Sequence, residues 1–197
     1  MPRPSQTAEQ RRKLLPIICQ VFSDLGYRRT TTAELAERCG VRENILYRLW
    51  PDKKAMFLAA IDDIFRQRAE KWGLILGDRS RPEQAVARLV AYEAKHQGEF
   101  GFYRVVFTAL AETDDADMRS ALTDMYRRFQ RLVKRHVEES RTGERRSFGL
   151  TAEASAWGLI GLATVSNILR ELELLGPRER EQMFAAVAKH LVEGTAG

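Results

Sequence analysis

Apolar residues along the chain recur at three- and four-residue spacing, the period of an amphipathic helix rather than of a strand. The first such segment has Leu14, Ile18, Phe22 and Leu25 on one face, and Gly26 marks its end. Thr7 opens a capping-box pattern, so this helix is predicted to begin there. Further helices are predicted over 32–39, 42–50, from residue 52 onward, and over 82–97, 100–112, 117–140, 151–175 and 177–192. The pattern predicts an all-α fold of about nine helices.

Two stretches interrupt this helical pattern. Residues 76–82 contain glycine, proline and mixed charges, and residues 141–149 contain two glycines among charged neighbours. Both are predicted to be loops that connect helices.

Composition and cysteine content narrow the class of protein. Hydrophobic residues make up 44% of the 197 and charged residues 30%, which favours a folded globular chain over a disordered one. No run approaches the roughly 18 apolar residues of a membrane span, and the first residues do not resemble a secretory signal. Cys19 and Cys39 are too few for a disulfide framework. We therefore expect a cytoplasmic protein.

The positive charge is concentrated at the N-terminal end. Residues 1–54 contain 11 lysines and arginines against 6 aspartates and glutamates, and the remaining residues contain 21 of each kind. A local cationic excess is typical of a phosphate-binding surface. A basic face that only contacts solvent is the alternative.

The segment 30–50 has the pattern of a helix-turn-helix motif. Gly40 lies at the predicted turn, and Ala36 is a small residue where the two helices would touch. The positions predicted to point inward are Leu35, Ala36, Cys39, Val41, Leu46 and Leu49. In such motifs the second helix enters the major groove of DNA. A generic amphipathic helical hairpin is the alternative.

The same region resembles a known family. Residues 22–57 are similar to the DNA-binding region of the tetracycline-repressor (TetR) family of bacterial regulators. The matching features are Phe22 before Gly26, Thr31-Thr32, Leu35-Ala36, Gly40-Val41, Leu46-Tyr47, and Trp50 before Pro51-Asp52-Lys53. The resemblance implies a helix-turn-helix DNA-binding domain over 1–53 and a ligand-binding and dimerisation domain over 54–197.

The resemblance also implies roles for individual residues in DNA binding. Thr31 and Thr32 open the first short helix, where Thr32 would cap it and offer its hydroxyl and amide to a phosphate. Tyr47 and Lys53 match the family's contacts to the DNA backbone. The candidates for contacts to bases are Arg42, Glu43, Asn44 and Arg48, of which Arg48 suits guanine and Asn44 adenine.

Departures from the family pattern at residues 42, 44, 45 and 49 leave the operator sequence open. Arg11, Arg12 and Lys13 either reach a flanking phosphate or minor groove or are solvated helix charges.

The C-terminal part resembles the family's effector and dimerisation half more loosely. Candidates for lining an effector pocket are Tyr92, Phe100, Tyr103, Phe107, Met125, Phe129 and Trp157, although aromatic residues at helical spacing are also typical of a core. In the family the last two helices pair with their copies. The candidates for this dimer interface are Gly158, Gly161, Val165, Phe184, Val187 and Leu191, with intramolecular packing as the alternative.

Catalytic and metal-binding patterns are weak. The sequence has no glycine-rich phosphate loop, and its three histidines are scattered. Glu93 and His96 form one Glu-x-x-His pair, but a di-iron site needs two. We expect no enzyme, metal or cofactor.

The prediction is a ligand-responsive, homodimeric repressor that binds a palindromic DNA operator and is released by a small-molecule effector. The alternative is an α-helical ligand-binding dimer without sequence-specific DNA binding.

Overall fold

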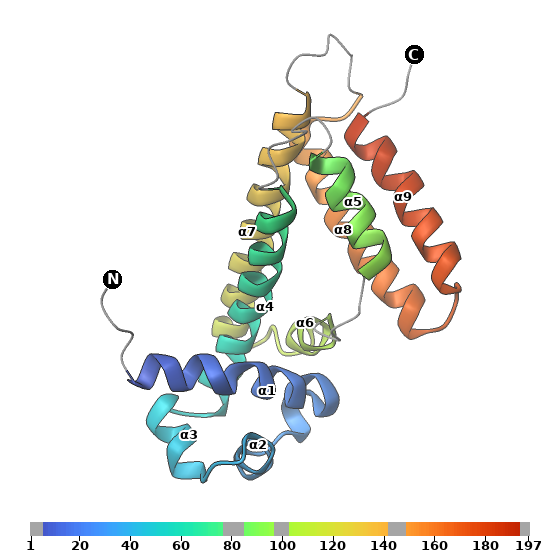
Figure 1. The fold of residues 1–197 in the computed structure, drawn as a ribbon. Coiled ribbons are helices and arrows are strands. Elements are labelled where there is room, and N and C mark those ends of the chain that lie inside the picture. The colour runs from blue at the N-terminus through green and yellow to red at the C-terminus, as the bar shows by residue number, and fades with distance from the viewer. Residues whose placement is uncertain (1–5, 77–84, 97–102, 142–148, 194–197) are drawn as a thin grey trace. The chain divides into compact units, whose positions relative to one another are not determined.

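The structure is a computed structural model and describes residues 6–76, 85–96, 103–141 and 149–193 of the chain. Every regular element in these ranges is a helix, which confirms the predicted all-α fold (Figure 1). The elements are α1 (Gln6–Arg29), α2 (Thr32–Cys39), α3 (Glu43–Leu49), α4 (Lys53–Leu76), α5 (Ala85–His96), α6 (Tyr103–Leu110), α7 (Ala116–Arg141), α8 (Ala152–Glu171) and α9 (Pro177–Glu193).

The chain divides into two compact units. Unit 1 comprises residues 1–67 and 100–125, and unit 2 comprises residues 68–99 and 126–197. Helices α4 and α7 therefore each contribute one part to unit 1 and the other part to unit 2. The predicted domain boundary after residue 53 falls at the first turn of α4, whereas the packing units divide inside this helix.

Unit 1 is built around α1, which packs against α2, α3 and α6. Phe22 and Phe57 are completely buried in its core, and the partly buried Tyr27 packs beside them: the Phe57 ring lies 4.8 Å from the rings of both Phe22 and Tyr27, measured between centroids. Burial of large apolar side chains is the main stabilising contribution to such a core. The helix-turn-helix is anchored to it by its own completely buried side chains, Leu35 and Leu46.

Two predicted helix caps are wrong. Helix α1 already includes Gln6, so Thr7 lies inside the helix and does not cap it. The N-cap of α2 is Thr31 and not Thr32, because Thr31 has the extended backbone of a cap and its hydroxyl accepts the Glu34 amide at 3.2 Å. The helical backbone of α1 is broken at Gly26, where φ is +74°, as predicted for its end.

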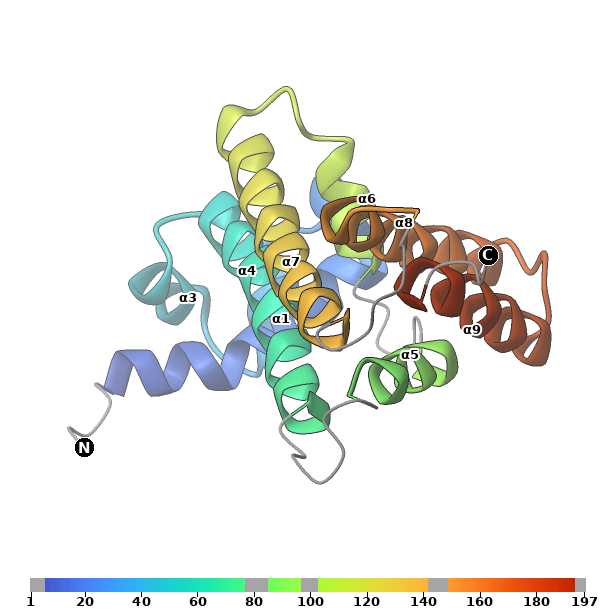
Figure 2. The ribbon, with the colours of Figure 1, turned by 90° about the horizontal axis from the view of Figure 1, so that it is seen from above.

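Unit 2 contains α5, α8, α9 and the C-terminal parts of α4 and α7. Helix α9 packs against both α8 and α5 (Figure 2). One buried apolar cluster of this unit contains Trp72, Leu89, Val133, Val137 and Ala156. None of the helices in the described ranges combines the length and the apolar character needed to cross a membrane.

Candidate nucleic-acid interface

The turn between α2 and α3 is set by Gly40. Its φ of +64° and ψ of 31° are left-handed, a conformation that glycine adopts without the clash of a Cβ atom. The Gly40 amide donates to the Glu37 carbonyl and the Val41 amide to the Ala36 carbonyl, both at 3.0 Å. These two bonds form a Schellman motif, which ends α2 and redirects the chain into α3.

The N-terminal end of α2 lies beside the exposed end of Tyr47 from α3. The Tyr47 hydroxyl donates to the Thr32 hydroxyl at 3.1 Å, so two of the predicted backbone contacts are neighbours in the structure. Tyr47 is 48% exposed. A helix N-terminus with free amides and hydroxyls is a favourable position for a phosphate.

Lys53, the first residue of α4, is already engaged within the protein. Its Nζ donates to the carbonyls of Tyr27 and Thr30 at 3.0 Å each and lies 4.5 Å from the centre of the Tyr27 ring. The ammonium therefore joins the start of α4 to the segment between α1 and α2. One of its three donors and its full charge remain for a phosphate.

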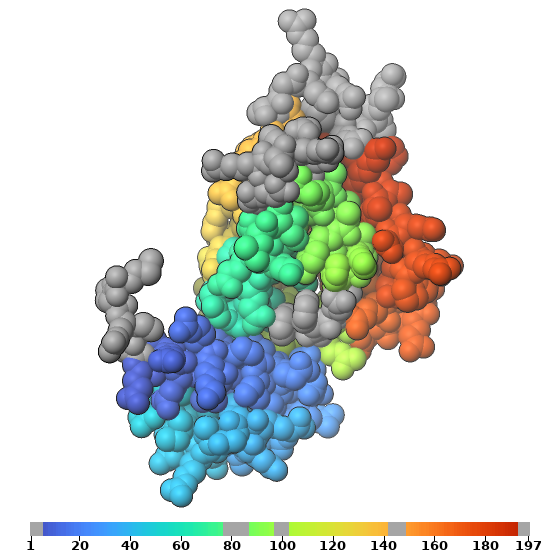
Figure 3. Space-filling model, in the orientation of Figure 1, coloured from blue at the N-terminus to red at the C-terminus, as the bar shows by residue number. Residues whose placement is uncertain are grey.

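Helix α3 presents a polar face to solvent. Its buried side is formed by Leu46 and Leu49, while the predicted base-contacting residues are all exposed, namely Arg42, Glu43, Asn44 and Arg48. The atoms of α2 and α3, in light blue and cyan, form an open part of the surface in Figure 3. This geometry presents a short helix with its polar side outward, as a reader of the major groove requires.

Gln10 and Arg11 of α1 contact α3, and the sequence analysis did not predict these contacts. Arg11 donates from Nε to the Leu49 carbonyl at 2.8 Å and donates from Nη2 to the same oxygen, and its guanidinium lies 5.9 Å from the centre of the Trp50 ring. Gln10 accepts a hydrogen bond from Nη2 of Arg48 at 3.0 Å. No local pattern could have indicated these contacts, because the partners are 38 residues apart.

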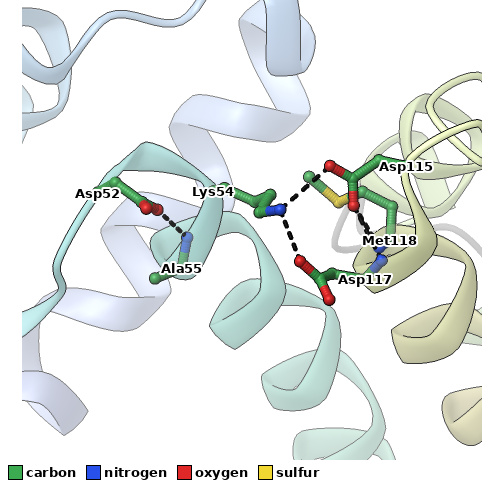
Figure 4. A network of polar contacts seen from close by, with 6 residues as sticks. All are labelled: Asp52, Lys54, Ala55, Asp115, Asp117 and Met118. Carbon is green, nitrogen blue, oxygen red and sulfur yellow. Dashed lines mark hydrogen bonds and ion pairs between the residues drawn. The ribbon is translucent and has the colours of Figure 1, made fainter.

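Ion pairs join α1 and α4 to the segment between α6 and α7 and to the first turn of α7. Arg28 contacts Glu112 at 2.7 Å, and Nζ of Lys54 lies 3.1 Å from Asp115 and 2.6 Å from Asp117 (Figure 4). Hydrogen bonds from the Met118 amide and from Lys54 lower the pKa of Asp115, and bonds to Asp117 and Asp115 raise the pKa of Lys54. Asp52 precedes α4 and caps it, because its carboxylate accepts the Ala55 amide at 2.7 Å (Figure 4).

The predicted pocket residues occupy separate places. In unit 1, the rings of Tyr103 and Phe107 contact each other edge to face at 5.9 Å, and Met125 is buried. In unit 2, Phe129 lies 5.6 Å from Trp72 and Tyr92 stacks on His96 at 4.3 Å. Phe100 lies outside the described residues.

Trp157 is 45% exposed and lies on an apolar stripe along α8. The stripe consists of Trp157, Gly161, Val165, Ile168 and Leu172, which follow one another at four- and three-residue spacing and are all exposed. Large apolar side chains gathered on one exposed helix face are typical of an interaction surface. The sequence assigned Gly161 and Val165 to the dimer interface but Trp157 to the pocket.

The other predicted interface residues divide between surface and core. Val187 of α9 is 40% exposed, whereas Phe184 is only 4% exposed. A Cβ atom at Gly158 would lie 2.9 Å from the Leu191 side chain, so this glycine permits close packing of α8 on α9 within one chain. Gly158, Phe184 and Leu191 thus contribute to packing inside unit 2.

Glu93 and His96, the single Glu-x-x-His pair, have partners within the protein. One Glu93 oxygen accepts from Trp72 Nε1 at 2.8 Å and from Arg68 at 3.0 Å, and His96 Nδ1 lies 2.9 Å from the Tyr92 carbonyl. Within the described ranges, no three histidine, cysteine, aspartate or glutamate side chains are grouped so that they could hold a metal ion.

The fold and the interface define a helix-turn-helix DNA-binding protein. Residues 18–60 match the profile of the bacterial regulatory proteins of the tetR family. Over these residues the chain has the DNA-binding domain of this family, which is the domain of a DNA-binding transcriptional regulator.

Solved structures agree with this fold. A transcriptional regulator from Saccharomonospora viridis, in complex with choline, superposes with a TM-score of 0.77 at 19% identity. The match covers 92% of this chain and 96% of the Saccharomonospora chain. FadR from Bacillus subtilis, in complex with stearoyl-CoA, superposes with a TM-score of 0.72 at 14% identity, and the match covers 94% of this chain and 99% of the FadR chain. Among curated proteins, the nucleoid occlusion factor SlmA of Vibrio campbellii is 24% identical over 162 residues, or 80% of this chain and 81% of SlmA.

Proposed function

We propose that the protein is a cytoplasmic, ligand-responsive repressor that binds a palindromic operator as a homodimer. The observation that carries this proposal is the pair of Thr32 and Tyr47 hydroxyls beside the exposed polar face of α3. The pair suits backbone phosphates, and the face of α3 suits base edges in the adjacent major groove. Residues 1–53 would form the DNA-binding domain.

Each residue of the interface has a distinct role in this proposal. Thr31 holds the first turn of α2 by its cap, and Thr32 and Tyr47 offer hydroxyls to a phosphate. Lys53 adds charge. The base-reading residues are Arg42, Glu43, Asn44 and Arg48, with Arg48 directed at guanine and Asn44 at adenine.

The dimer would form through the apolar stripe of α8 together with Val187 of α9. This proposal includes Trp157, Ile168 and Leu172, whose exposure on the same helix face favours a role in association. A two-fold dimer places two recognition helices about 34–36 Å apart, or a multiple of this distance, on a palindrome.

A small apolar or amphipathic effector would bind residues 54–197 and lower the affinity for the operator. The choline and stearoyl-CoA complexes of the two structural neighbours support ligand binding by this fold. The partly buried Tyr92, Tyr103, Phe107 and Phe129 and the buried Met125 remain candidates for effector contacts, and no catalytic role is assigned to them. Effector and operator must then weaken each other's binding by the same factor, with a coupling of about 1–3 kcal/mol.

Selection of bound sequences from a random duplex pool, at two salt concentrations, tests the proposal. We expect an enriched palindrome. Salt-sensitive binding without any enriched sequence would instead favour a ligand-binding dimer that has lost sequence recognition. One observation favours this second candidate: Arg42 stands at the N-cap of α3 without a capping hydrogen bond from its side chain.

Two substitutions separate the phosphate contact from the base contact. Tyr47→Phe removes only a hydroxyl and is expected to weaken binding to all sequences about equally. Arg48→Ala is expected to cost about 1–3 kcal/mol at one base position and to relax the preference there. Arg127→Ala, which removes an exposed charge of α7 in unit 2, is the matched control. If Arg48→Ala left the selected sequence unchanged, the proposed reading face would be wrong.

A further inference from the structure

The C-terminal end of α3 is contacted by the first turns of α1. Helix α3 has only seven residues, so the carbonyls of its last turn lack partners inside the helix. The Trp50 amide donates to Leu46, and the Leu49 carbonyl accepts both bonds from Arg11. A cation at this end is also favoured by the helix dipole.

The contact with the end of α3 distinguishes Arg11 from Arg12 and Lys13, which carry the same charge. All three side chains are exposed and lie in the same turn of α1, but it is the Arg11 guanidinium that donates to the Leu49 carbonyl at the end of α3. The fork of Arg11 is held on one side by the Leu49 carbonyl and on the other by the Trp50 ring, which is only 5% exposed. Leu49 itself is 1% exposed, so its backbone is fixed to the core of unit 1.

The base-reading side chain of the same helix is also held by α1. Arg48 precedes Leu49, and its Nη2 donates to Oε1 of Gln10 at 3.0 Å. Gln10 and Arg11 are consecutive residues, so one turn of α1 contacts both the backbone end of α3 and the side chain that points outward from it.

We propose that Arg11 is a positioning residue for sequence-specific DNA recognition. Its guanidinium holds the C-terminal end of α3 in the pose from which Arg48, oriented by Gln10, reads a base. This inference rests on the proposed function, and it assigns to Arg11 no contact with DNA. A small displacement of a short helix changes every base contact it makes, whereas attraction to phosphates is less sensitive to it.

A pair of substitutions in the full-length protein distinguishes positioning from a phosphate contact. In Arg11→Gln the amide Nε2 occupies the same place along the side chain as Nε of arginine, so it retains the donor to Leu49 but loses the charge. Arg11→Lys retains the charge but loses the planar fork. Arg11→Ala loses both, and Arg12→Ala removes a neighbouring charge.

Binding to the selected operator and to random duplex is then measured over a range of salt concentrations. We expect Arg11→Ala to lose about tenfold in operator affinity, with less than about a twofold change on random DNA and an unchanged salt slope. Arg11→Gln is expected to recover most of this loss. A phosphate contact would give a different result: Arg11→Lys alone would recover the affinity, and the salt slope would fall by about 1 in Arg11→Gln and Arg11→Ala. This result would overturn the proposal.

Amide hydrogen exchange of residues 43–50 in the DNA-free protein provides a readout that does not depend on the operator. We expect faster exchange in Arg11→Ala than in Arg11→Gln or Arg12→Ala. Exchange equal to that of the wild type in Arg11→Ala would overturn the positioning role. If the wild-type protein showed no operator preference, the proposed repressor function would fail, and the exchange measurement would still decide on the role of Arg11.

Discussion

Single residues with unusual backbone or burial determine local parts of this protein. Gly40 is one of them, because its left-handed backbone ends α2 and sets the angle at which α3 follows. Apart from Gly40 itself and the residues adjacent to it in the chain, no heavy atom lies within 4 Å of the place that a Cβ would occupy there. A side chain there would be strained by its own backbone and not by its neighbours.

We expect Gly40→Ala to lower the free energy of unfolding by about 1 kcal/mol, the cost of a left-handed alanine. Gly40→Asn should cost less, because asparagine tolerates this conformation better than alanine. Urea unfolding of the three proteins checks this order. Equal stability of the alanine variant and the wild type would mean that the turn does not need a left-handed residue.

Cys19 is a second residue whose environment determines its chemistry. It is completely buried in unit 1, and its Sγ lies 3.9 Å from an Asp63 oxygen. Burial, followed by the negative charge of Asp63, raises the pKa of the thiol far above its usual value. Because the thiolate is the reactive form, such a thiol is inert.

Alkylation by iodoacetamide at pH 8 is therefore expected to label Cys39 but not Cys19 in the folded protein. Cys39 is only partly buried, although burial raises its pKa as well and should slow its labelling. Mass spectrometry of the peptides gives the extent of labelling, and both thiols should react in urea. Labelling of Cys19 at the rate of Cys39 in the folded state would contradict the burial described here.

At the scale of elements, Arg141 at the end of α7 joins three helices of unit 2. It donates to the carbonyls of Leu191 and Val192 in α9 at 3.0 and 3.1 Å, and to the Ser155 hydroxyl in α8 at 2.9 Å. Loss of hydration lowers its pKa, as is usual for a cation withdrawn from water. The guanidinium thus satisfies carbonyls at the C-terminal end of α9.

We expect Arg141→Leu to destabilise the protein by about 3 kcal/mol, because several acceptors lose a charged donor at once. Arg135→Leu is the control on the same helix: Arg135 forms an exposed ion pair with Glu139 at 3.9 Å and should contribute less than about 1 kcal/mol. Urea unfolding followed by far-UV circular dichroism measures both changes. Similar losses in the two variants would argue against a special role of Arg141.

The segment between α6 and α7 makes unit 1 sensitive to acid. In the folded protein the pKa of Asp115 is lowered from its usual 3.8, first by the Met118 amide and then by Lys54. A carboxyl group with a lowered pKa stabilises the folded state above pH 3.8, and this contribution is lost as the pH falls through the folded pKa.

Asp115→Asn is therefore expected to reduce the loss of stability between about pH 5 and pH 2. Asparagine retains an oxygen that can accept the Met118 amide, so the variant should fold. The free energy of unfolding, measured in urea across this range, checks the prediction. Asp114→Asn, at the adjacent position, is the control, and an equally reduced pH dependence in both variants would contradict the assignment to Asp115.

At the scale of the whole molecule, the exposed stripe of α8 makes a prediction about assembly. Val165 is 48% exposed, so a charge at this position should leave the fold of unit 2 intact while placing an unpaired carboxylate in the proposed dimer interface. We expect Val165→Glu to be monomeric and to bind the operator with about half the salt slope of the wild type.

Leu74→Glu is the matched control for this variant, because Leu74 is an even more exposed apolar residue, at 76%, on α4 of the same unit. Sedimentation analysis of both variants gives the oligomeric state. Retention of the dimer in Val165→Glu, or its loss in both variants, would argue against the α8 stripe as the specific interface.

The positions of the helices along the chain could be predicted from the sequence, because helix formation depends on side chains within about one turn of each other. The periodicity of apolar residues and the glycine at position 40 placed α2 at 32–39, where the structure has it. The cap of the same helix was misassigned, since Thr31 and Thr32 carry the same side chain. Only the backbone conformation of each residue decides which of them caps.

The different contacts of two identical neighbouring residues, in contrast, follow only from the tertiary structure. Lys53 and Lys54 are identical neighbours, yet Lys53 contacts carbonyls near the end of α1 and Lys54 contacts carboxylates 61 and 63 residues away. In the same way, Arg11 and Arg12 differ only in that one of them faces α3. Such contacts depend on how distant helices pack, and the local sequence pattern contains no information about the partner across the fold.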